Sequence, residues 1–119
     1  MSALSYTQTY IRSLKKLTVQ EKGLVQEFIV EFMEDKTGAG ISLEPIQRTK
    51  NKNLWSGRVN DDLRMILLKN KSDWKMVYVD HHDKAYKWAE RKRIHVDSNN
   101  TFVIEQVEWK IVEKIEEKV

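Results

Sequence analysis

The chain has 119 residues, of which 40% are hydrophobic and 33% charged, and it has no cysteine. This length favours one domain over residues 1–119, because a single core usually fills about 100–150 residues. The lack of cysteine excludes disulfides, thiol nucleophiles and cysteine-type metal sites. No apolar run approaches the roughly 18–20 residues that span a bilayer, so a cytoplasmic protein without a membrane partner is expected.

The net charge of +3 is unevenly distributed. Residues 41–95 carry thirteen basic and seven acidic side chains, a surplus of +6, whereas residues 96–119 carry three and six, a balance of −3. A basic central section predicts a polyanionic partner, RNA or DNA.

The first part of the chain has the spacing of two helices. Apolar residues recur at helical intervals over residues 6–17, which predicts a short amphipathic helix. Thr18 and Glu21 have the T-x-x-E spacing of a capping box, so a second helix is expected to begin there and to end near Gly38. The two helices would form a hairpin that needs another layer against its apolar face.

The middle of the chain has the pattern of short strands. Residues 37–53 are polar and contain the only proline, which predicts a loop. Three apolar runs then cover residues 54–59, 63–69 and 74–80, separated by turn-forming residues. This pattern predicts an antiparallel meander.

A helix is predicted over residues 83–93, with Asp83 as its cap and residues 91–93 in its last turn. The basic residues of that turn suit the helix dipole, and the alternative is a contact with nucleic acid. A final hairpin is expected from strands over residues 94–97 and 101–107. A last helix is expected over residues 105–119, so its start overlaps the end of the second strand.

The densest group of reactive side chains lies at residues 79–86, at the predicted strand-to-helix junction. His81 and His82 stand there beside two aspartates and Tyr86. Imidazole moves protons near neutral pH, so one interpretation is general acid–base chemistry. A metal site is a second, but neighbouring strand residues point to opposite faces, which separates the two histidines. A third is structural, with one histidine capping the helix and the other hydrogen-bonded. No metal or cofactor is expected.

Arginine and lysine side chains in the middle section are candidates for phosphate contacts. Arg58 and Arg64 lie on neighbouring predicted strands, close enough to converge on one anion. The alternative is that each is a solvated strand residue paired with Asp61 or Asp62. Further positive potential comes from the preceding loop, at Arg48, Lys50 and Lys52.

Two segments carry a family resemblance. They are L-W-S-G-R-V-N-D-D-L-R-M-I-L at residues 54–67 and V-Y-V-D-H-H-D-K-A-Y-K-W-A at residues 77–89. Together with the helical hairpin they resemble the RelE/ParE toxin superfamily. The likeness is closer to the variant of that domain at the N-terminus of some bacterial UvrD/Rep-type superfamily I DNA helicases, and it runs from about Leu14 to Val107.

The resemblance implies an α+β fold in which the helical hairpin packs on a twisted antiparallel sheet, with a further C-terminal helix. It also implies metal-independent RNA cleavage, in which the 2′-hydroxyl attacks the adjacent phosphate. Arg64, His81 and Tyr86 match the family's arginine, histidine and tyrosine. On this interpretation Arg58 and Arg64 stabilise the phosphorane, His81 or His82 is the base or acid, and Tyr86 orients or protonates.

One departure shapes the functional hypotheses. His82 stands where the family pattern has arginine, and a neutral imidazole supplies less positive charge to a phosphorane. The main hypothesis is therefore a nucleic-acid-associated accessory module of a UvrD-type helicase, of which these residues would be an N-terminal fragment. The alternative is a toxin that cleaves mRNA and binds an antitoxin. The third is a protein-interaction module that binds no nucleic acid.

Overall fold

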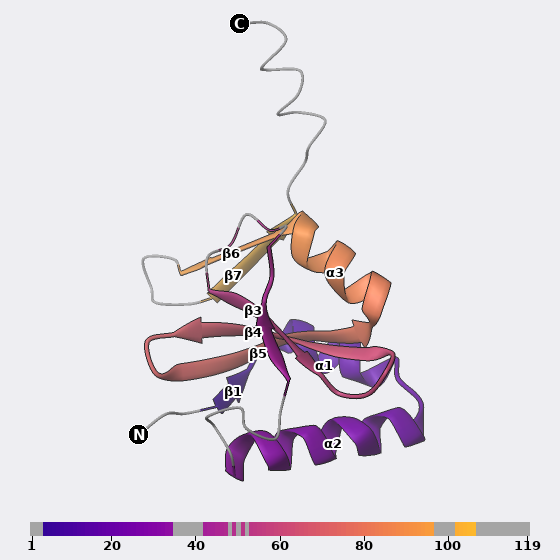
Figure 1. Ribbon diagram of the computed structural model, residues 1–119. Helices are drawn as coiled ribbons and strands as arrows, with labels where there is room; N and C mark the ends of the chain where they lie inside the picture. The colour runs from indigo at the N-terminus through magenta and orange to yellow at the C-terminus, as the bar shows by residue number, and fades with distance from the viewer. Residues whose placement is uncertain are drawn as a thin grey trace, which may run out of the picture.

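Five strands form a central sheet with helices on both faces, and two further strands form a separate hairpin (Figure 1). The computed structural model describes residues 4–34, 42–47, 49, 51, 53–96 and 102–106. The elements in these residues are β1 (Leu4–Tyr6), α1 (Gln8–Lys15), α2 (Val19–Glu34), β2 (Leu43–Pro45), β3 (Leu54–Arg58), β4 (Leu63–Asn70), β5 (Asp73–His81), α3 (His82–Arg91), β6 (Lys92–Val96) and β7 (Phe102–Gln106). The sheet has the order β1-β5-β4-β3-β2. The predicted α+β class is confirmed.

The first helix is shorter than the sequence predicted. Thr7 caps α1 by accepting a hydrogen bond from the Tyr10 amide at 3.1 Å, so the residues before it lie outside the helix. They form β1, which pairs with β5 in parallel, so the sheet is mixed rather than wholly antiparallel. The expected helix over residues 6–17 was wrong at its start, because Tyr6 shares the helical spacing of Tyr10 without belonging to the helix.

The second helix begins where the capping box predicts. The Thr18 amide donates to the Glu21 carboxylate at 2.9 Å, and the Glu21 amide donates to the Thr18 hydroxyl at 3.1 Å. Phe28 and Phe32 are buried on the face of α2 that packs, with α1, against the sheet. The predicted helix end at Gly38 lies outside the described residues. No helix in the described part of the chain is long and apolar enough to cross a membrane.

The predicted meander is confirmed as β3, β4 and β5, each antiparallel to the next. Side chains alternate along β4, so Leu63, Met65 and Leu67 pack against the helical hairpin. Ile66, between them, points to the opposite face, where it packs near α3. Arg64 lies on that opposite face too, because it is two residues before Ile66 on the same strand.

The segment over residues 37–53 contains an element that the sequence did not predict. Leu43–Pro45 form β2, an edge strand antiparallel to β3. Proline fits this position because an edge strand does not need every amide donor. Next to β2, Gly57 lets α2 approach the sheet closely, since a Cβ there would lie 2.5 Å from Cζ of Phe28.

The third helix covers the opposite face of the sheet. Ala85 and Ala89 are fully buried there against Ile66 and Val77. The small alanines let α3 lie close to the strands. This face, and not the face of the helical hairpin, carries the site described below.

The ends of α3 differ from the prediction. Its N-cap residue is His81, which makes no side-chain cap bond, and Asp83 lies within the first turn instead of capping it. Lys92 and Arg93 begin β6, so only Arg91 of the three basic residues belongs to the last turn.

The final hairpin is confirmed as β6 and β7. β7 runs through Gln106, so the expected last helix does not begin at Glu105. Residues 107–119, where the rest of that helix was expected, lie outside the described residues.

Candidate functional site

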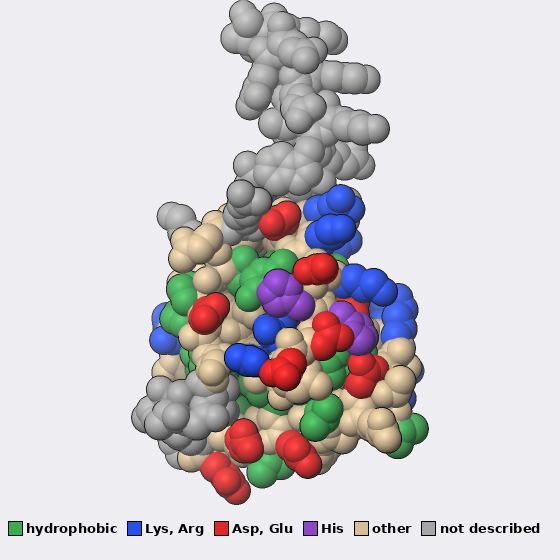
Figure 2. Space-filling model, turned by 45° about the vertical axis from the view of Figure 1, so that its right-hand side comes forward, with side chains coloured by type: hydrophobic (Ala, Val, Ile, Leu, Met, Phe, Trp, Pro, Cys, Tyr) green, Lys and Arg blue, Asp and Glu red, His purple; other side chains and the backbone are tan. Residues whose placement is uncertain are grey.

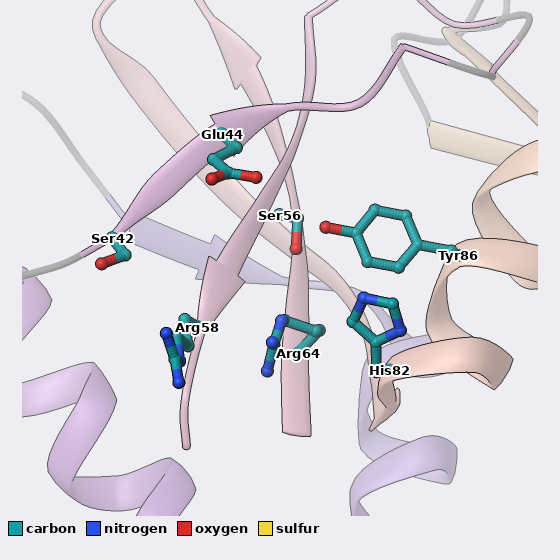
Figure 3. Close-up of a pocket in the computed structure, with 7 residues that line it drawn as sticks. All are labelled: Ser42, Glu44, Ser56, Arg58, Arg64, His82 and Tyr86. Carbon is teal, nitrogen blue, oxygen red and sulfur yellow. The ribbon is translucent and has the colours of Figure 1, made fainter. Parts of the chain in front are cut away.

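A pocket of about 170 Å³ opens on the sheet face that carries α3 (Figure 3). One wall comes from β2 and the residue before it, the floor from β3 and β4, and the other wall from α3. The lining side chains are those of Ser42, Glu44, Ser56, Arg58, Arg64, His82 and Tyr86.

The two arginines of the pocket are held together by a tight turn. Arg58 and Arg64 are direct partners in the register of β3 and β4. The Asn60 side chain fixes the turn by accepting hydrogen bonds from the amides of Asp62 (2.9 Å) and Leu63 (2.6 Å). The two arginines therefore lie side by side and line one pocket, and their convergence on an anion stays a prediction.

The two guanidinium groups differ in what they bind. Arg58 forms an ion pair with Asp61 at 2.6 Å, which confirms the sequence alternative for this residue. The side chains of Arg58 and Asp61 are both largely exposed, so this ion pair contributes little to stability, and a phosphate can replace Asp61 as the partner of Arg58. Arg64 donates instead to the carbonyls of Asn60 (2.7 Å) and Leu63 (3.0 Å), and forms no ion pair within the described part of the chain. Those neutral carbonyls orient its guanidinium without an ion pair, and the Asp62 carboxylate interacts with its charge at longer range.

The two neighbouring histidines lie in different environments. β5 ends at His81 and α3 begins at His82, so the backbone turns between them. The His81 ring bonds the Asp62 carboxylate and lies 3.2 Å from the Glu21 carboxylate, away from the pocket lining. His82 lines the pocket. The described residues contain no group of three or more His, Asp or Glu side chains arranged to hold a metal ion.

The His82 ring is positioned from two sides. Its Nδ1 lies 3.0 Å from an Asp83 carboxylate oxygen, and its ring centroid lies 4.7 Å from that of Tyr86, one helical turn later. The His82 amide also donates to the Asp62 carbonyl at 2.6 Å, which fixes the start of α3 to the β3–β4 turn. A carboxylate at Nδ1 orients the imidazole ring.

The contact between His81 and Asp62 predicts a pH-dependent stability. The hydrogen bond to Asp62 raises the pKa of His81 above its ordinary 6.5, and the same bond lowers the pKa of Asp62 below 3.8. The His81 contribution is therefore present below about pH 6.5 and is lost as the pH rises through the raised value, while the Asp62 contribution is lost in acid. Urea unfolding should show that wild type loses more stability than His81→Gln between about pH 6 and pH 9. Parallel pH profiles for the two proteins would contradict this.

Three pocket residues were not predicted from the sequence, namely Ser42, Glu44 and Ser56. Ser56 could have been found, because Leu54, Ser56 and Arg58 stand at every second position of β3 and so share one face of the strand. Glu44 gave no signal, since the strand that presents it was predicted as a loop. Arg48, Lys50 and Lys52, predicted as further nucleic-acid contacts, lie outside the described residues.

The fold is that of RelE-like toxins. No protein-family model and no curated protein matches the chain. Among solved structures, it is similar to the RelB-RelE antitoxin-toxin complex from Methanococcus jannaschii, with 14% identity and a TM-score of 0.57 over 70% of this chain and 95% of that chain. The toxin-antitoxin complex RelBE2 from Mycobacterium tuberculosis shows 20% identity and a TM-score of 0.56, and the match covers 68% of this chain and 91% of that chain. YafQ from E. coli shows 10% identity and a TM-score of 0.57, and the match covers 72% of this chain and 99% of that chain.

Proposed function

We propose that this chain is a RelE-like toxin that cleaves RNA without a metal ion, by attack of a 2′-hydroxyl on the adjacent phosphate. The observation that carries the proposal is the pocket in which two arginines, a histidine, a tyrosine and a carboxylate meet on a RelE-like fold. These are the side chains that the reaction requires: cations for the phosphate and groups that transfer protons.

The arginines bind the scissile phosphate. Guanidinium groups recognise phosphate oxygens through pairs of parallel N–H bonds, and Arg58 and Arg64 stand side by side in the pocket. As the phosphorus becomes pentacoordinate, negative charge grows on its oxygens. Arg64, which forms no ion pair within the described residues, stabilises that charge most.

Two proton transfers complete the step. The Glu44 carboxylate, across the pocket from α3 in Figure 3, takes the proton of the 2′-hydroxyl as its oxygen attacks phosphorus. The bond from phosphorus to the 5′-oxygen breaks, and His82 gives that oxygen a proton. Tyr86 orients the phosphate beside His82. The products are a 2′,3′-cyclic phosphate and a 5′-hydroxyl.

An antitoxin protein is the proposed partner in the cell. Two of the similar solved structures are RelE-type toxins crystallised with RelB antitoxins, which supports this proposal. The accessory role in a UvrD-type helicase keeps only the sequence motifs as support, since the similar structures are toxins. For that reason we prefer cleavage to a module that only binds nucleic acid or protein.

The proposal is tested by incubating the purified chain with end-labelled mRNA, both free and bound to ribosomes. We expect fragments ending in 2′,3′-cyclic phosphate, formed equally well in the presence of EDTA. A substrate with deoxyribose at the cleaved nucleotide is the control, because it lacks the attacking oxygen and should stay intact. Binding of RNA without product on both substrates would refute cleavage and restore the binding-module hypothesis.

A further inference from the structure

A second hollow, of about 300 Å³, lies beside α3 and shares no residue with the proposed cleavage pocket. We call it the α3 groove. It is lined by Tyr78, Asp80, Lys84, Lys87, Trp88, Arg91 and Lys92. In Figure 2, Lys and Arg side chains gather along the right-hand side of the molecule at the level of α3.

Helical geometry places the groove and the pocket on opposite flanks of α3. Ala85 and Ala89 face the sheet, and successive residues are rotated by about 100°. His82 and Tyr86 therefore project on one side of the buried stripe, toward the pocket. Lys84, Trp88 and Arg91 project on the other side, into the groove.

The groove has a rigid aromatic wall and an excess of positive charge. Tyr78 and Trp88 stack with ring centroids 4.4 Å apart and an interplanar angle of 1°. Four cationic side chains line the groove against one carboxylate, that of Asp80. This carboxylate accepts hydrogen bonds from the Tyr78 hydroxyl and the His81 amide, both at 2.8 Å. Asp80 is thus held in place by its neighbours, and its single negative charge is outnumbered by the cations that line the groove.

The cations of α3 stand unpaired. Within the described residues, Lys84, Lys87 and Arg91 form no ion pair. They follow one another at spacings of three and four residues, at which like charges on a helix repel. An anion that bridges them would relieve this repulsion.

We infer that the α3 groove binds the phosphate backbone of the RNA strand whose cleaved phosphate lies in the pocket. The inference rests on the proposed function for the identity of the strand. A helix with its side chains is about 10–12 Å across, and successive phosphates of a stacked strand advance about 3.4 Å. Roughly three to four nucleotides therefore span α3 and bring the next phosphates to the groove. Lysine and arginine contacts of this kind add affinity without reading sequence.

The test compares two triple variants by fluorescence anisotropy. One is Lys84→Gln/Lys87→Gln/Arg91→Gln in the groove. The other, Arg12→Gln/Lys15→Gln/Lys16→Gln, removes three exposed cations from α1 and the residue after it. The ligands are a trinucleotide and an oligouridine of about 12 nucleotides, both fully 2′-O-methylated so that no cleavage occurs. The groove variant should bind the longer ligand about tenfold more weakly at about 100 mM salt, with its salt slope reduced by about 2. Its affinity for the trinucleotide should stay within about twofold of wild type.

Equal losses for the two triple variants on the longer ligand would overturn the inference, as would no loss for the groove variant. Lys87→Glu serves as a second variant, because reversal of one exposed charge leaves the fold intact and should weaken binding in the same direction. The outcome is separable from that of cleavage. If wild type cuts RNA but the groove variant binds as wild type does, only the groove inference fails. If wild type does not cut while the groove variant alone weakens binding, only the proposed function fails.

Discussion

Replacing Arg64 with alanine is expected to lower the rate of RNA cleavage by about 10²–10³-fold, as removal of one preorganised donor to a developing oxyanion usually does. The physical reason is its position. Arg64 is oriented by two backbone carbonyls and forms no ion pair with a carboxylate within the described residues. The measurement is single-turnover cleavage of end-labelled RNA with the protein in excess, so that weaker binding and slower chemistry are separated.

Two matched variants make the Arg64 result interpretable. Arg58→Ala should lower the rate less, because the Arg58 guanidinium already shares its charge with Asp61. Arg12→Ala on α1 removes an exposed arginine that does not line the pocket, from a helix on the opposite face of the sheet, and should leave the rate unchanged. If Arg12→Ala and Arg64→Ala slow cleavage equally, the pocket is not where the chemistry occurs.

The second large effect separates the two adjacent histidines. His82→Ala is expected to lower cleavage by about 10²–10⁴-fold, the range for loss of a general acid. His81→Ala should keep the rate within a few-fold of wild type, because the His81 ring bonds Asp62 and Glu21 away from the pocket lining. Cleavage rates of the two variants on one substrate at neutral pH measure the difference.

Added imidazole provides the control for His82. The pocket is open to solvent, and the side chain of His82 is about half exposed, so free imidazole can enter the space left by the substitution. It should restore part of the activity of His82→Ala and none of that of Arg64→Ala. A greater loss in His81→Ala than in His82→Ala would instead assign the proton transfer to the histidine that matches the family motif.

The local signals of the sequence predicted the centre of the fold well. Capping chemistry at Thr18 and Glu21 is read from adjacent residues, and so is the alternation that defines β3, β4 and β5. The Arg58–Arg64 pairing also follows from a short turn between two strands. Each of these features depends on contacts close in sequence, which is why a single chain was sufficient to find them.

The features that the sequence missed depend on distant contacts. β1 exists because Leu4 to Tyr6 pair with β5, some seventy residues later in the chain. A segment of three residues carries no pattern from which that pairing could be predicted. β2 is equally short and lies on an edge. Glu44 was missed along with it. The sequence separated His81 from His82 but did not show which of them lines the pocket. That depends on the exact residue at which β5 ends and α3 begins, and so on how α3 packs on the sheet.

The turn between β3 and β4 has a consequence for how this protein can vary. Exposed turns usually accept insertions with little cost. Here Asp62 bonds the His81 ring through its carboxylate and receives the His82 amide at its carbonyl, while Asn60 sets the spacing of the arginines. One extra residue would shift all of these at once. Natural variation in loop length should therefore collect at the other hairpin turn, around Lys71, and leave this one fixed in length.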